Sequence, residues 1–110
     1  MSYSEKLVLS RLQQLVATPS VSSTDKSWDQ GNRPVIDLLA SWLADMGFAT
    51  EIMAVTEDGR KANLIATLGS GPGGLVLAGH TDTVPYDEGR WQSDPLSLTE
   101  RDQRLYGLGS

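Results

Sequence analysis

The sequence predicts an α/β fold, because two helical patterns come first and several strand patterns follow them. Up to Met46 the apolar residues recur at three- and four-residue spacings, which is typical of amphipathic helices. After Gly47 the pattern changes to short apolar runs separated by glycine-rich turns. One of these runs, residues 75–79, is apolar throughout, and it predicts a central strand covered on both faces.

We expect a first helix that begins after Ser4, a plausible N-cap residue, and closes before Pro19. Its apolar face would carry Leu7, Val8, Leu12, Leu15 and Val16. Residues 19–31 are polar and predict a loop. Asn32 would cap a second helix, with Pro34 in its first turn and Gly47 as the residue that ends it. The apolar positions of this helix are Val35, Leu38, Leu39, Trp42, Leu43 and Met46.

The second half of the chain predicts strands. Residues 48–55 and 62–68 form two strand patterns that are joined by the turn sequence of residues 56–61. The glycine-rich segment 69–74 is expected to be a tight connection rather than a phosphate loop, because no Lys-Ser or Lys-Thr pair and no helix follow it. Residues 96–110 predict a closing hairpin with its turn near residues 101–103.

Composition narrows the function. The net charge is −5, with 9 basic and 14 acidic residues, and no basic cluster reverses it, so we expect no nucleic-acid partner. Cysteine is absent, which excludes disulfides, thiolate metal sites and a cysteine nucleophile. The N-terminal residues lack a signal-peptide pattern, and the apolar runs are too short to span a bilayer, so we expect a cytoplasmic protein without membrane contact.

The chemically most informative residues follow the apolar run 75–79. His80 is the only histidine, and Asp82 lies two positions later, at the carboxyl end of the predicted strand, where α/β sheets bind ligands. A neutral imidazole is a good zinc or cobalt ligand, and a nearby carboxylate can accept its second N–H. Asp82 could also bind metal itself. A solvated loop histidine beside a capping aspartate is the alternative that the residues leave open.

The chain resembles the zinc-dependent aminoacylase and exopeptidase family. The pattern is an apolar strand, then Gly-His-x-Asp-x-Val-Pro at residues 79–85, a Trp followed by Asp-Pro at residues 91–95, and Leu-Tyr-Gly-x-Gly at residues 105–109. The resemblance implies metal-dependent amide hydrolysis with two Zn²⁺ or Co²⁺ ions per active site. His80 would ligate one ion, and Asp82 would be the acidic catalytic residue that supports His80.

Within this family the longer segments most resemble members that remove the acetyl group from N2-acetyl-L-ornithine, a step in arginine biosynthesis. Another N-acyl-amino-acid deacylase, such as a succinyl-diaminopimelate desuccinylase, or a dipeptidase is the alternative. The resemblance implies that residues 1–110 are the N-terminal portion of the catalytic domain. The other ligands and the lid domain with its homodimer contacts would then lie elsewhere, and the chain alone would be inactive and bind zinc weakly. A non-catalytic remnant or interaction module is the third hypothesis.

Overall fold

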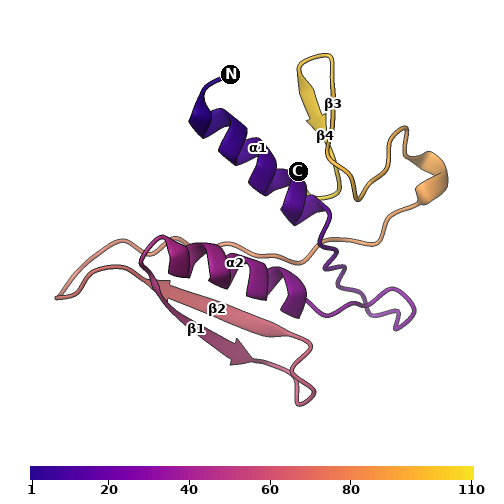
Figure 1. The fold of residues 1–110 in the computed structure, drawn as a ribbon. Coiled ribbons are helices and arrows are strands. Elements are labelled where there is room, and N and C mark those ends of the chain that lie inside the picture. Colours follow the sequence, from indigo (N-terminus) through magenta and orange to yellow (C-terminus); the bar gives the residue numbers. More distant parts are fainter.

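The computed structural model describes the backbone of residues 1–110 and every side chain except that of Glu88. In chain order its elements are α1 (Tyr3–Val16), α2 (Arg33–Asp45), β1 (Ala49–Ala54), β2 (Ala62–Thr67), the short 3-10 helix η1 (Glu88–Arg90), β3 (Thr99–Arg101) and β4 (Arg104–Tyr106). The α/β prediction is therefore confirmed, with helices first and strands after them (Figure 1).

The second helix and the first two strands form one layered unit. β1 and β2 pair antiparallel over six residues each, from Ala49 opposite Thr67 to Ala54 opposite Ala62. α2 lies over one face of this pair (Figure 1) and buries Val35, Ile36 and Ala40. The other face of the pair has no covering layer in the described structure, which is why most residues of β1 are exposed.

The cap of α1 differs from the prediction. Ser2, not Ser4, is the N-cap: its hydroxyl accepts the Glu5 N–H at 3.2 Å, while the Glu5 carboxylate accepts the Ser2 N–H. This reciprocal capping box satisfies two backbone donors at once, which a cap at Ser4 would not do. The buried face of the helix is also narrower than predicted, because Val8 is 63% exposed whereas Val16 is buried.

The prediction of a central strand at residues 75–79 is wrong for this structure. The segment has no strand partner among the described residues, and Leu75, Val76 and Leu77 are 84–88% exposed. A strand needs a neighbour to satisfy its N–H and C=O groups, and neither β1 nor β2 is aligned beside this run. The apolar composition of the run predicted burial, whereas the residues that the structure describes leave its side chains exposed.

The closing hairpin is confirmed. β3 and β4 pair antiparallel from Thr99 opposite Tyr106 to Arg101 opposite Arg104. The two turn residues, Asp102 and Gln103, have φ values of 51° and 59°, as a type I′ hairpin turn requires. The hairpin lies beside α1 (Figure 1), and its end touches that helix: a Cβ on the buried Gly107 would lie 2.9 Å from a methyl group of Val16.

Candidate metal-binding site

The segment that carries His80 is fixed by the loop after α1. The Thr83 N–H donates to the Ser20 carbonyl at 3.1 Å, and the Ser22 N–H donates to the Thr83 carbonyl at 2.9 Å, which makes a short parallel bridge. The hydroxyl of Ser20, a buried residue, donates to the Thr81 carbonyl at 2.5 Å. Three hydrogen bonds therefore hold residues 81–83 against one loop.

Because side chains alternate along an extended segment, the contact of residues 81–83 with this loop determines which side chains of the segment are exposed. Thr81 and Thr83 are half-buried, whereas His80 and Asp82 are exposed, with 81% and 59% of their side chains accessible. His80 Nδ1 lies 3.0 Å from Asp82 Oδ1 and 3.2 Å from the Asp82 carbonyl oxygen. The structure thus brings the two predicted site residues into contact.

This contact has a chemical consequence for the imidazole. A carboxylate can only accept, so Nδ1 carries the proton and the lone pair of the neutral ring is on Nε2. Metal-ligating histidines show this arrangement, in which an acceptor on one nitrogen orients the ring and raises the basicity of the other. The donor set fits a single imidazole ligand to zinc or cobalt, with Asp82 as its support.

Asn32 also belongs to the site, and sequence reasoning missed this role. Its side-chain oxygen accepts the Ala62 N–H at 2.8 Å, and its amide nitrogen donates to the Ala62 carbonyl at 2.9 Å and to Thr81 Oγ1 at 3.2 Å. It does occupy the N-cap position of α2 as predicted, but its side chain makes no capping hydrogen bond. The sequence offers no local signal for this, because an asparagine before Arg-Pro resembles an ordinary cap.

An ion pair fixes the same loop to the turn between β1 and β2. Lys61 Nζ lies 2.8 Å from Asp29 Oδ1, and both side chains are about one-third exposed or less. The hydrogen bond from Lys61, with a second from the Ser23 N–H, holds the pKa of the Asp29 carboxyl below its ordinary value. The loop is thus attached to β2 at Asn32 and to the β1–β2 turn at Asp29.

His80 and Asp82 are among the residues that line a hollow of about 460 Å³, to which both helices contribute. The other residues that line it are all uncharged: Leu12, Leu15, Val16, Thr18, Pro19, Ser20, Val35, Leu39, Thr81, Thr83, Val84, Leu96, Leu108 and Gly109. In the described part of the chain, no group of three or more histidine, cysteine, aspartate or glutamate side chains is arranged so that it could hold a metal ion. His80 and Asp82 are therefore two candidate site residues that the structure brings into contact.

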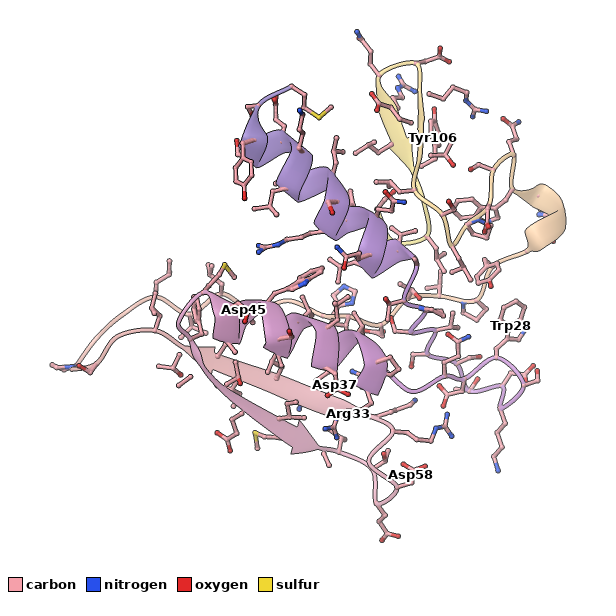
Figure 2. All side chains as sticks on the ribbon, in the orientation of Figure 1. Trp28, Arg33, Asp37, Asp45, Asp58 and Tyr106 are labelled. Atoms are coloured by element: carbon pink, nitrogen blue, oxygen red, sulfur yellow. The ribbon has the colours of Figure 1, made fainter. Side chains whose placement is uncertain are left out.

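Glycine, tryptophan and aspartate residues outside the His80 segment have structural roles. The glycines at 69, 71, 73 and 74 have positive φ values, which agrees with the predicted tight connection. Trp28 packs edge-to-face on Tyr86 with ring centroids 5.4 Å apart, and it lies on the loop after α1, away from α2 (Figure 2). The carboxylate of Asp58 accepts from Thr56 and from the Arg60 N–H, which is turn chemistry at the β1–β2 connection (Figure 2).

The chain is similar in sequence to known proteins. Over 97 residues, 88% of its length, the chain is 64% identical to acetylornithine deacetylase of Photorhabdus laumondii and 61% identical to that of Proteus mirabilis. It is 62% identical over 96 residues to acetylornithine deacetylase of Vibrio campbellii. The chain resembles the acetylornithine deacetylases. It spans about a quarter of the length of these relatives, and no family model matches it.

This similarity agrees with the resemblance that the sequence motifs indicate, and it covers about a quarter of each relative. The structure shows no helix long and apolar enough to cross a membrane among the residues it describes.

Proposed function

We propose that this chain supplies the first metal ligand of a deacetylase that acts on N2-acetyl-L-ornithine in arginine biosynthesis. The observation that carries the proposal is the His80–Asp82 contact of 3.0 Å. It occurs in a chain that is 64% identical over 97 residues to acetylornithine deacetylase of Photorhabdus laumondii. Residues 1–110 would form the N-terminal part of the catalytic domain.

His80 would hold the metal through Nε2, while Asp82 keeps the proton on Nδ1 and the ring in one orientation. A zinc or cobalt ion bound there would acidify a water molecule and polarise the acyl oxygen of the substrate. The half-buried Thr81 and Thr83, fixed to the loop after α1, restrict the motion of the pair. A well-fixed ligand needs no reorganisation when the metal binds.

The chain alone would not catalyse the reaction. A catalytic zinc site has at least three protein ligands, and the described side chains contain no group of three candidates. We propose that the other ligands, the general base and a lid domain with homodimer contacts belong to the further length found in the relatives. The isolated chain would then bind zinc weakly and show no turnover.

A chimera tests the proposal in a complete enzyme. The chain replaces the matching segment of the Photorhabdus laumondii acetylornithine deacetylase, and acetate release from N2-acetyl-L-ornithine is measured. We expect turnover comparable to that of the parent enzyme, and its loss in His80→Ala. Asp82→Asn should lower the turnover, whereas its matched control Asp102→Asn, which removes an exposed carboxylate from the β3–β4 turn, should leave it unchanged.

Two results would contradict the proposal. One is a folded, zinc-loaded chimera without turnover, and the other is full activity in the His80→Ala variant. N-succinyl-diaminopimelate serves as the competing substrate, and a preference for it would favour the alternative deacylase assignment.

A further inference from the structure

Asn32 is the N-cap residue of α2, but its side chain does not cap the helix. An asparagine at an N-cap position ordinarily uses its side-chain oxygen to accept a backbone N–H from the first turn of its own helix. In α2 that hydrogen bond is absent, and the oxygen accepts the Ala62 N–H instead. When a side chain does not make its usual local hydrogen bond, a tertiary contact commonly replaces that bond.

The amide of Asn32 joins three parts of the molecule. It stands at the start of α2, pairs with both backbone groups of Ala62 at the start of β2, and donates to the hydroxyl of Thr81 at 3.2 Å. These partners are 30 and 49 residues away in sequence. Only an amide offers one acceptor and two donors in this arrangement.

We propose that Asn32 is a positioning residue for His80 and acts through Thr81. This rests on the proposed function, because it assigns a role toward the metal-binding imidazole. Thr81 lies between His80 and Asp82, its hydroxyl accepts from Asn32, and its carbonyl accepts from Ser20. The two contacts fix the rotation of the segment about Thr81, so that its neighbours stay on one side and in contact.

Gly31 makes this reach possible. A Cβ at Gly31 would lie 2.5 Å from the carbonyl oxygen of Arg60, a backbone atom that cannot move aside without shifting β2. The absence of a side chain lets the Arg33 N–H donate to the same carbonyl at 3.1 Å. This close approach sets Asn32 at hydrogen-bonding distance from Ala62.

The test uses the fact that His80 is the only histidine, so its ring nitrogens give an unambiguous ¹⁵N NMR signal. The tautomer is read in the 110-residue chain, without metal, at a pH where the ring is neutral. Thr81→Val removes only the hydroxyl contact and keeps the Asn32–Ala62 pair, and Thr81→Ser restores the hydroxyl. Asn32→Ala removes all three contacts, and Asn63→Ala makes the same change at an exposed position of β2.

We expect the wild type, Thr81→Ser and Asn63→Ala to hold the proton on Nδ1. Thr81→Val and Asn32→Ala should shift the ring toward the Nε2–H tautomer, and zinc affinity should fall by about 10-fold, the lower end of the effect of losing a supporting residue. If Asn32→Ala does not fold, Thr81→Val decides. An unchanged tautomer in Thr81→Val, or a wild type without the Nδ1–H form, would overturn the proposal.

The tautomer separates this inference from the proposed function. A shift in Thr81→Val supports the positioning role even if zinc does not bind to the wild-type chain. Zinc binding that His80→Ala leaves unchanged would contradict the proposed function alone.

Discussion

At the scale of single residues, the site depends on which nitrogen of His80 is free. The carboxylate of Asp82 occupies Nδ1 at 3.0 Å, and Nε2 stays open on a side chain that is 81% exposed. A carboxylate favours the neutral imidazole that carries its proton on Nδ1, because the carboxylate can only accept a hydrogen bond and its negative charge strengthens that bond. The metal binding that we propose for this segment therefore depends on His80 and Asp82 together.

Asp82→Asn is expected to weaken zinc binding without abolishing it. The amide oxygen can still accept the Nδ1–H, but the negative charge that raises the basicity of Nε2 is lost. We expect the zinc Kd, measured by competition with a chromophoric chelator, to rise about 10- to 100-fold. Asp102→Asn is the control. A complete loss equal to that of His80→Ala would indicate that Asp82 is itself a metal ligand.

Gly31→Ala is expected to destabilise the fold. The new methyl group would meet the Arg60 carbonyl oxygen at 2.5 Å, so the loop or β2 must shift. Overpacking of this kind typically costs about 1–3 kcal/mol in the free energy of unfolding. Urea denaturation checks this, with Gly79→Ala as the control, because a Cβ there has no neighbour within 4 Å. Equal stability of both variants would contradict the close approach.

At the scale of elements, the loop between α1 and α2 connects the site to the rest of the fold. Its residues contact β2 through Asn32 and the β1–β2 turn through Asp29, and they back the His80 segment through Ser20. The position of the His80 segment therefore depends on the position of β2 through this loop. Disturbing either attachment should affect both stability and metal binding.

The Asp29–Lys61 pair predicts an acid-dependent stability. The folded pKa of Asp29 is lowered, so between its ordinary and its lowered pKa the unfolded chain binds more protons than the folded chain. The stabilisation is present above the ordinary pKa of 3.8 and is lost as the pH falls through the lowered value.

Lys61→Met removes the largest cause of this shift. We expect the Asp29 pKa, followed by carboxyl NMR titration, to rise toward its ordinary value, and the loss of stability on acidification to become smaller. Lys26→Met, in the same loop, is the control. An unchanged Asp29 pKa in Lys61→Met would contradict the assigned cause.

Most elements could be predicted from the sequence because their signals are local. The spacing of apolar residues gave α2, and turn residues gave the β1–β2 connection and the closing hairpin. Residues 75–79 could not be placed, because composition indicates that a segment suits burial but not what covers it. The approach of His80 and Asp82 was predictable from their two-residue spacing. The role of Asn32 was not, because its partners are 30 and 49 residues away.

At the scale of the whole molecule, the chain exposes more surface than its size leads one to expect. Its radius of gyration is 15.9 Å, whereas a compact domain of this length has about 13 Å. Its accessible surface is 8123 Å², against about 6,000 Å² for a folded monomer of 11.9 kDa. The excess includes the apolar run 75–77 and the lining of the hollow beside His80.

Self-association of the isolated chain is the expected consequence. An exposed extended run of Leu75, Val76 and Leu77 offers both unpaired backbone groups and apolar side chains to another chain. Leu77→Lys should lower the sedimentation-average mass at a given concentration, whereas Val55→Lys, an exposed position outside this run, should leave it unchanged. A monomeric wild-type chain at all concentrations would contradict this.

The most direct test of the account is the ¹⁵N NMR spectrum of the single imidazole as Zn²⁺ is added to the chain. The account predicts that the Nε2 signal moves to the position of a metal-bound nitrogen while Nδ1 keeps its proton toward Asp82. Ring signals that are unchanged at a large excess of Zn²⁺, or a shift of Nδ1 in place of Nε2, would contradict it.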